Sequence, residues 1–264
     1  MRSNLGGQGD KKKPLSLYIH IPFCVQKCLY CDFLSAKASK QEKEAYVKKL
    51  LEEMEYWKET LQKEYVIQTV LGGGTPTCLR AEELLQIGRK LSELPLALQA
   101  CKDGKEKNAV PPFFEFTAEA NPGTLTREKV HALKEIGVNR VSIGLQSVHG
   151  KELKALGRIH TYQDLLDWNE SSAYTITYGQ FLETYYAARE CGFSNINVDL
   201  MADIPNQTVE SYQATLSSVT ELSPEHISSY SLIVEEGTPF YKMQEEGKLL
   251  LPDEEMDRQM YCLT

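Results

Sequence analysis

The hydrophobic and polar positions along the chain predict six short β-strands. Each predicted strand is a run rich in Val, Ile, Phe or Tyr, and polar or glycine-rich stretches bound it. These runs cover residues 15–21, 66–72, 113–120, 140–146, 195–201 and 226–234. Between most of them the apolar positions change to a helical spacing, so that strands and helices alternate.

Three of the intervening helices have the clearest sequence signals. Apolar residues at spacings of three and four predict a helix over residues 46–61. A second helix is expected over 126–137, with a threonine as its N-cap and a glycine as its C-cap. A third is expected after the "PNQT" turn, over 209–222, and it stops before Pro224. Strands that alternate with helices in this way predict parallel βαβ units.

Two stretches of the chain echo one another. "KEIGVNRVSIGL" (134–145) superimposes on "RECGFSNINVDL" (189–200), and each predicts a helix end, a capping Gly137 or Gly192, and a strand. The alignment places Cys191 where the other copy has an isoleucine. We therefore expect Cys191 to be a small buried apolar residue rather than a reactive thiol.

Six βα units predict an α/β fold with a parallel sheet, which is either an incomplete barrel or an open doubly wound sheet. In both architectures ligands bind where the carboxyl ends of the strands meet the following loops. The first strand leads into a cysteine-rich loop and the second into "GGGTPT" (72–77). Glu119, Gln146 and Asp199 lie at the ends of the next three strands. The pattern therefore predicts one site at this end of the sheet.

Composition and charge exclude several classes of protein. The 264 residues carry a formal net charge of -8, which argues against broad nucleic-acid binding because that needs a basic surface. No apolar run approaches the ~18 residues of a membrane span. Residues 1–14 are expected to be a disordered basic lead-in, and they lack the apolar region of a secretion signal. A cytoplasmic location is expected.

Three of the seven cysteines are clustered, which points to metal or redox chemistry rather than disulfides. Cys24, Cys28 and Cys31 form a C-x3-C-x2-C motif. A structural zinc site closes with four ligands, and no second pair follows here. Three thiolates on one short loop instead fit a [4Fe–4S] cluster with one iron left open. His20 is an alternative extra ligand, whereas Cys78 is expected to pack in the protein.

The cysteine motif resembles that of the radical S-adenosylmethionine (SAM) superfamily. It follows a strand and has an aromatic residue, Tyr30, before its last cysteine. The glycine run at the end of the second strand adds to the resemblance, since glycine lets the backbone approach a ligand closely. The resemblance implies that the open iron chelates SAM and that the reduced cluster can cleave it to a 5′-deoxyadenosyl radical.

A longer set of motifs is similar to the oxygen-independent coproporphyrinogen III oxidase group, and closest to its branch of heme chaperones. The motifs are "LYIHIPFCVQKCLYCDF", "GGGTPT", "EANPGTL", "GVNRVSIGLQS", "LGRIHT", "NVDLM" and "YSLIVEEGTPF". The resemblance implies an incomplete TIM-type (β/α)6 barrel of parallel strands, with a radical SAM core over residues 15–242. It further implies that residues 243–264 begin a truncated C-terminal region.

The resemblance assigns a role to thirteen residues, position by position. Three cysteines would hold the cluster, two tyrosines would flank the methionyl part of SAM, and the glycine run would bind it. Two carboxylates, a glutamine and an arginine match positions that contact SAM or a second copy of it, and an isoleucine matches one near the adenosine. These residues are Cys24, Cys28, Cys31, Tyr18, Tyr30, Gly73, Gly74, Thr75, Glu119, Gln146, Arg158, Asp199 and Ile233.

Two functions remain open at this stage. A heme chaperone would bind the cluster, SAM and heme, and would deliver heme to an apo-hemoprotein. An oxidase would instead use the radical to decarboxylate the propionates of a porphyrinogen. The oxidases carry one more cysteine two positions after the motif, where this chain has Asp32 and Phe33. The lead before the first strand is also short, and both departures favour the chaperone.

Two polar stretches depart from the pattern of the family. Residues 98–112, which include Cys101, are expected to form a surface insertion. The Ser/Thr/Tyr-rich residues 167–186 are expected to be a loop insertion before the fifth strand. His160, in "RIHT", is expected to make a hydrogen bond at a helix start.

Overall fold

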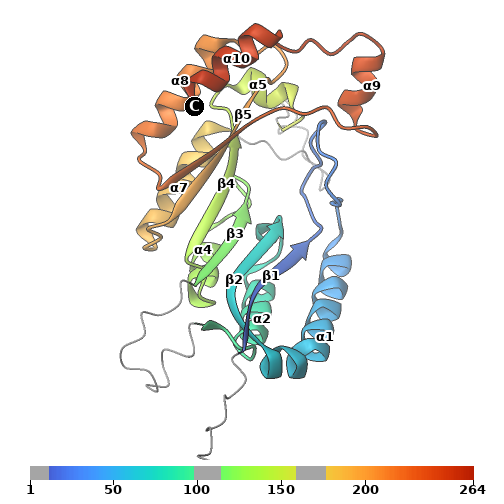
Figure 1. Ribbon diagram of the computed structural model, residues 1–264, viewed down its shortest axis with the longest axis vertical. Helices are drawn as coiled ribbons and strands as arrows, with labels where there is room; N and C mark the ends of the chain where they lie inside the picture. Colours follow the sequence, from blue (N-terminus) through green and yellow to red (C-terminus); the bar gives the residue numbers. More distant parts are fainter. Residues whose placement is uncertain (1–11, 98–113, 159–176) are drawn as a thin grey trace, which may run out of the picture.

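The computed structural model describes residues 12–97, 114–158 and 177–264. Six strands in this part of the chain form one parallel sheet in the order β1-β2-β3-β4-β5-β6 (Figure 1). The strands are β1 (Lys13–Ile21), β2 (Tyr65–Gly74), β3 (Glu115–Ala120), β4 (Arg140–Gln146), β5 (Ile196–Ala202) and β6 (His226–Ser231). The sheet curves but does not close, because β1 and β6 are its two edges. This is the expected incomplete TIM-type barrel.

Helices connect successive strands of the sheet, and two more helices, α9 and α10, follow the last strand (Figure 1). They are α1 (Lys40–Glu64), α2 (Ala81–Leu91), α4 (Arg127–Glu135), α5 (Gly150–Ala155), α7 (Tyr178–Glu190), α8 (Val209–Glu221), α9 (Pro239–Glu245) and α10 (Glu254–Leu263). A short 3-10 turn, η1 (Pro76–Cys78), follows β2. Each connection returns the chain to the same end of the sheet, as parallel strands require.

Local signals in the sequence explain where several helices begin. Ser39 begins α1 with a capping box, in which its hydroxyl accepts from the Glu42 backbone N–H and the Glu42 carboxylate accepts from Ser39. Thr126 caps α4 as expected. Gly137 and Gly192 both adopt positive φ, at 94° and 83°, directly after a helix. The predicted echo between these two segments is therefore confirmed, because each glycine ends a helix in the left-handed region.

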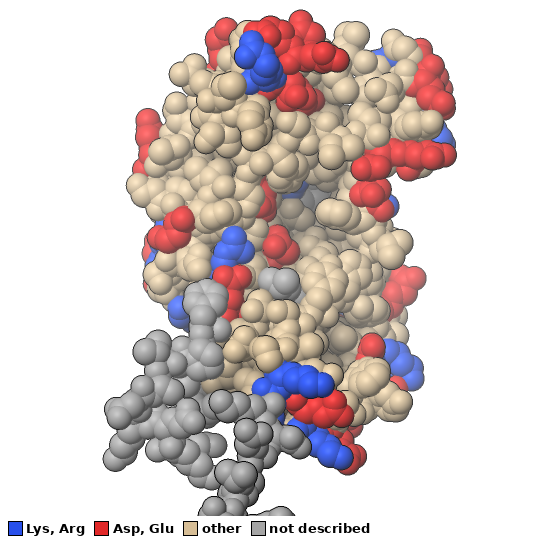
Figure 2. Space-filling model, viewed as in Figure 1, with Lys and Arg blue, Asp and Glu red and all other residues tan. Residues whose placement is uncertain are grey.

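Acidic side chains gather on the last two helices of the chain. Figure 2 shows them over α9 and α10, where Glu245, Glu246, Glu254, Glu255 and Asp257 are found.

The expected boundary at residues 242/243 falls inside α9 rather than between two units. Furthermore, α10 packs against α8 and β5, and its Met260 is fully buried beside Tyr212.

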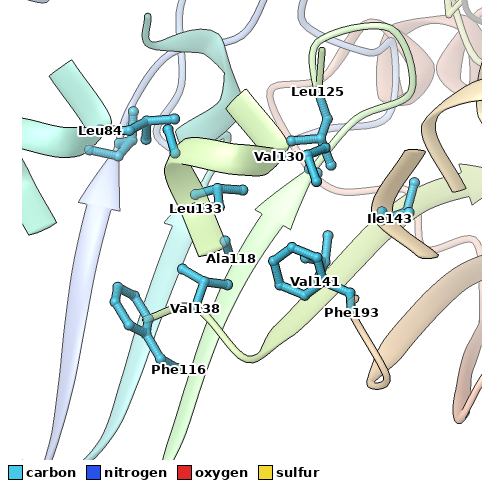
Figure 3. Close-up of a cluster of buried hydrophobic side chains, with 14 of the residues drawn as sticks. Leu84, Phe116, Ala118, Leu125, Val130, Leu133, Val138, Val141, Ile143 and Phe193 are labelled. Atoms are coloured by element: carbon cyan, nitrogen blue, oxygen red, sulfur yellow. The ribbon is translucent and has the colours of Figure 1, made fainter. Parts of the chain in front are cut away.

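The main core lies between the outer face of the sheet and the helices. Figure 3 shows Val130 and Leu133 of α4 facing Phe116 and Ala118 of β3. Alternate residues of β4 and β5 face the same core, since a strand turns successive side chains to opposite faces. The outer face of the central strands β3, β4 and β5 is therefore apolar and buried.

The structure corrects three of the expected features. Strand β1 begins at Lys13, so the basic lead-in expected over 1–14 is shorter than proposed. Part of the stretch 167–186, which was expected to be a loop, is helical, because α7 begins at Tyr178. Cys191 is half-buried rather than buried, and its sulfur lies 3.6 Å from Nε2 of His131. Cys101, His160 and the rest of both insertions lie outside the described residues.

Candidate functional site

The cysteine loop that follows β1 is fixed by backbone hydrogen bonds. At its base, the Cys24 N–H donates to the Ala36 carbonyl at 3.0 Å. At its tip, the Leu29 N–H donates to the carbonyl of Leu156 at 3.0 Å, and the Leu29 carbonyl accepts from Phe240 at 3.1 Å. These bonds join the loop to the end of α5 and the start of α9. The loop therefore has a defined shape in the protein itself.

The three cysteines of the motif line one cavity of about 420 Å³. All three are half-buried and free of disulfides. Among the residues that the structure describes, no three His, Cys, Asp or Glu side chains converge closely enough to hold a single metal ion. Three thiolates that each bind a different iron are the ligands that a [4Fe–4S] cluster takes from a protein when one iron stays open.

The electrostatics of the loop also suit a metal cluster. Burial raises the pKa of the Cys31 thiol, and the neighbouring Cys28 and Cys24 raise it further, while a hydrogen bond from the Phe33 backbone opposes them. The raised pKa of Cys31 favours its protonated form, and a nearby cation would favour its thiolate. Iron would supply this positive charge, and a thiol loses its proton when it coordinates a metal ion.

The glycine run allows β2 to approach β1 closely. A Cβ atom on Gly73 would lie 2.3 Å from the Tyr18 ring, and one on Gly74 would lie 2.1 Å from the Ile21 carbonyl oxygen. Gly74 also has a φ of +71°, which favours glycine. Thr75 follows, and its Oγ1 lies 3.6 Å from Cys24 Sγ. The run thus brings its backbone and the Thr75 hydroxyl next to the cysteine loop.

Two carboxylates lie on the inner face of the sheet. Asp199 accepts a hydrogen bond from Ser142 Oγ at 2.9 Å and another from Asn197 Nδ2 at 2.7 Å. Burial raises the pKa of Glu119 to about 7, and repulsion from Asp199 adds to the shift, although a hydrogen bond from Ser142 opposes it. Near neutral pH Glu119 is therefore close to its own pKa, and a cationic ligand beside it would favour its ionised form.

Arg158 supplies the positive charge of the site. It is only 6% exposed, and its Nη2 donates to Asn121 Oδ1 at 2.6 Å and to the Gly144 carbonyl at 2.9 Å. Its Nε is buried without a hydrogen-bond partner among the described groups. A buried guanidinium with a spare donor is suited to an anionic ligand such as a carboxylate. Tyr30 lies beside it, and burial raises the pKa of that phenol.

Gln146 ends β4 in an unusual backbone conformation. Its φ is 73°, in the left-handed region, and the pairing of β4 with β5 shifts register here. The side chain is 4% exposed, and its Oε1 accepts a hydrogen bond from the Tyr230 hydroxyl at 2.9 Å. A non-glycine residue in this region costs about 1–3 kcal/mol, which is typical of residues held for a function.

A second cavity of about 620 Å³ adjoins the first. The two share Phe33, Gly74 and Glu119, and the second is lined in addition by Tyr18, His20, Leu34, Gly72, Gly73 and Thr117. Figure 2 shows this side of the molecule hollowed at its centre, with charged side chains inside. Both nitrogens of His20 have partners, since Nε2 lies 2.9 Å from the Leu34 carbonyl and Nδ1 lies 3.0 Å from the Tyr18 hydroxyl. These contacts do not favour His20 as a cluster ligand.

Twelve of the thirteen predicted site residues line these two cavities. The exception is Ile233, which follows β6, is 68% exposed, and does not line either cavity. Sequence reasoning missed Asn121 and Tyr230, which contact Arg158 and Gln146. Both residues lie within quoted motifs, "EANPGTL" and "YSLIVEEGTPF", so the only available signal was a polar side chain inside a motif.

The fold and the site define a class of protein, and the comparison with known families agrees with it. A sequence model of the Radical SAM superfamily matches residues 18–219. The chain belongs to this superfamily. Membership implies a [4Fe–4S] cluster and SAM, and the thiols, the glycine run and Arg158 fit both groups.

The relatives are more specific. The chain is 36% identical over 249 residues to the heme chaperone HemW of Bacillus subtilis, covering 93% of this chain and 58% of the relative. It is 37% identical over 233 residues to HemW of Escherichia coli, covering 87% of this chain and 53% of the relative. The chain spans about half the length of the curated relatives it matches.

A solved structure supports the fold. Coproporphyrinogen III oxidase (HemN) from Escherichia coli, a radical SAM enzyme, matches with a TM-score of 0.73 and 23% sequence identity. The match covers 95% of this chain and 51% of that one. The predicted resemblance to this group, closest to the heme chaperones, is confirmed. In the part of the chain that the structure describes, no helix is both long and apolar enough to cross a membrane.

Proposed function

We propose that this chain is a heme chaperone-like radical SAM protein that holds a [4Fe–4S] cluster through Cys24, Cys28 and Cys31. The observation that carries the proposal is the convergence of these three thiols with Glu119, Asp199 and Arg158 on one cavity. Similarity to HemW from several bacteria supports the same function. A reducing compartment such as the cytoplasm fits cysteines that stay free of disulfides.

The residues of the cavity have complementary roles toward SAM. A [4Fe–4S] cluster held by the three thiols would supply the electron that reduces the sulfonium of bound SAM. Arg158 binds the carboxylate of the ligand, since its Nε has a free donor. Glu119 and Asp199 accept hydrogen bonds from its ammonium group or its ribose hydroxyls.

The glycine run and two aromatic side chains complete the proposed SAM site. Gly73 and Gly74 present backbone amides, and Tyr18 and Tyr30 flank the methionyl chain. Gln146 binds SAM or a second copy of it, whereas Ile233 lies outside both cavities and is given no contact with the ligand.

Asp32 and Phe33 favour heme delivery over porphyrinogen oxidation. They occupy the position where the oxidases carry a further cysteine, and Phe33 is 72% exposed at the border of both cavities. A planar apolar ligand such as heme would cover an exposed aromatic ring. The acceptor in this proposal is an apo-hemoprotein. The alternative is the oxidase, in which the same site would abstract hydrogen from a porphyrinogen propionate.

One experiment separates the two functions. The protein is reconstituted with iron and sulfide without air and reduced with SAM present. Deoxyadenosine and coproporphyrinogen are then assayed beside heme binding by absorbance. Heme uptake without loss of coproporphyrinogen is expected. Decarboxylation that depends on the substrate would overturn the chaperone proposal, and failure to bind iron at all would overturn both functions.

A further inference from the structure

The turn after β3 places an amide side chain against the buried Arg158. Asn121 directly follows β3, and its Oδ1 accepts a hydrogen bond from Arg158 Nη2 at 2.6 Å. The Asn121 Nδ2 donates at 3.3 Å to Oγ1 of Thr75, which follows the glycine run. These partners determine the orientation of the amide, because a flipped amide would turn its NH2 group toward the guanidinium donors. One half-buried side chain thus joins the arginine of the site to the glycine-rich turn.

The backbone around this contact is fixed. The Asn121 carbonyl accepts from the backbone N–H of Thr124 at 3.1 Å and from its hydroxyl at 2.7 Å. The Thr124 hydroxyl also lies 2.6 Å from that of Thr77, and both threonines are buried. Gly144 of β4 leaves the space for the contact, since a Cβ atom there would lie 3.1 Å from Asn121 Oδ1 and 3.7 Å from Arg158 Nη2. The amide is therefore held at the arginine by the turns after β2 and β3.

The partners of Arg158 leave its positive charge uncompensated. Its Nη2 donates to the neutral amide of Asn121 and to the Gly144 carbonyl. Glu119 and Asp199 line the same cavity, yet in the part of the chain that the structure describes no ion pair includes Arg158. A buried cation without a counter-ion is unfavourable, so it attracts an anionic ligand more strongly than a cation that is already paired. A carboxylate at position 121 would have the same shape as the amide but would neutralise this charge.

We propose that Asn121 is a positioning residue for Arg158, whose neutral amide orients the guanidinium and leaves its full charge available to the carboxylate of a ligand. The inference rests on the proposed function, because that function assigns the carboxylate of SAM to Arg158. An amide suits this role better than a carboxylate, since it accepts the hydrogen bond without competing with the ligand for the charge.

The preference of the protein for a carboxylate tests the proposal. Calorimetry on the cluster-reconstituted protein compares SAM with its decarboxylated analogue, which keeps the amine and the sulfonium. Asn121→Asp keeps the shape and the hydrogen bond to Arg158 but adds a negative charge, so it should lower the preference for SAM over the analogue by about tenfold or more. Asn121→Ala should lower it by about three- to tenfold. An unchanged preference in Asn121→Asp would overturn the proposal, since a merely structural contact would tolerate this exchange.

Asn139→Asp is the matched control. Asn139 precedes β4, at the end of the sheet opposite to the site. Its Oδ1 accepts from the Phe116 N–H at 2.9 Å, and its Nδ2 donates to the Phe114 carbonyl at 2.8 Å. The variant adds the same charge away from Arg158 and should keep the preference of the wild type. An equal loss of preference in Asn139→Asp and Asn121→Asp would assign the effect to net charge and overturn the proposal.

Urea denaturation of the cluster-free protein separates this inference from the proposed function. Asn121→Asp should unfold at a higher urea concentration than the wild type, because it pairs the buried guanidinium, and Asn121→Ala should unfold at a lower one. If the wild type binds neither cluster nor SAM, the proposed function fails, whereas the urea midpoints still decide the inference. A midpoint for Asn121→Asp below that of the wild type would overturn it. Should Asn121→Ala not fold, the comparison of Asn121→Asp with the wild type carries the test alone.

Discussion

The two faces of the same strands differ in chemistry. On the outer face, Val141, Ile143 and Val198 are fully buried in the main core. On the inner face, their neighbours Ser142 and Asp199 join a polar network. The interior of a complete TIM barrel is filled by layers of branched apolar side chains. Here the main apolar core lies outside the sheet, a small apolar cluster that includes Met201 lies on the inner side, and the cavity beside it is available for ligands.

The two faces of the sheet are expected to serve different purposes, the outer face the stability of the fold and the inner face the binding of ligands. Substitutions on the outer face should unfold the protein without a specific effect on ligands. Those on the inner face should change binding while the sheet stays folded.

The largest effect is expected at the cysteine loop. Cys28→Ser should abolish the visible absorbance of the iron–sulfur cluster, because three thiolates are needed to hold it. Cys28 is half-buried, so the free energy of unfolding of the cluster-free protein should change by less than about 0.5 kcal/mol. Cys262→Ser, at an exposed position on α10, is the control and should keep full absorbance. An unchanged spectrum in Cys28→Ser would exclude it as a ligand.

Ile143→Ala should produce the largest loss of stability. The side chain is fully buried in the outer core, and removing it leaves a cavity. The free energy of unfolding should fall by about 2–5 kcal/mol in urea denaturation. At temperatures where the variant stays folded, its affinity for SAM should equal that of the wild type. A large loss of affinity in the folded variant would contradict the division between the two faces.

Arg158→Lys should weaken the binding of SAM by roughly 10- to 100-fold, because lysine keeps the charge but loses the forked donor geometry. Calorimetry on the reconstituted protein would measure the dissociation constant. Arg189→Lys is the matched control, since Arg189 forms a two-oxygen contact with Glu225 on the outside of the sheet. That variant should lose stability and keep its affinity. Equal affinities for Arg158→Lys and the wild type would remove Arg158 from the site.

Glu119 should make stability depend on pH. Burial raises its pKa from 4.5 to about 7, so the folded protein binds more protons than the unfolded chain between these values. Stability from this group is therefore lost as the pH rises from about 4.5 to about 7, by an amount of the order of 2 kcal/mol. Glu119→Gln should remove this slope in denaturation measured across that range. An identical slope in the variant would assign it to another group.

Ile233→Ala should have the smallest effect. The side chain is 68% exposed, and substitutions at such positions change stability by about 0.5 kcal/mol at most. Its affinity for SAM should stay within about twofold of the wild type if the ligand does not reach beyond the end of β6. A loss of tenfold or more would show that the segment after β6 closes over the adenosine when SAM binds.

The strands could be predicted because their signal is local. The central strands place apolar residues on the covered face at every second position, and the fifth alternates in this way from Ile196 to Ala202. The start of α7 was missed because its Ser/Thr/Tyr-rich composition suggested a loop. The helix forms nonetheless, since Thr177 makes a capping box with Gln180 and the aromatic residues Phe181 and Tyr185 are buried.

The site could be predicted only as far as its motifs reach. The cysteine spacing and the glycine run are readable because neighbouring residues carry the chemistry. The bond from Arg158 to Asn121 joins residues 37 positions apart, and the bond from Tyr230 to Gln146 joins residues 84 apart. Such pairs depend on how the sheet curves, which no single stretch of sequence specifies.

The left-handed backbone of Gln146 has a consequence for directed evolution. Gln146→Gly would relax the chain there, and a library selected only for heat resistance should be enriched in it. The same change deletes the oxygen that orients Tyr230. Variants selected for heat resistance alone are therefore expected to bind their small-molecule ligand more weakly. A selection for thermal stability should include the ligand from its first round.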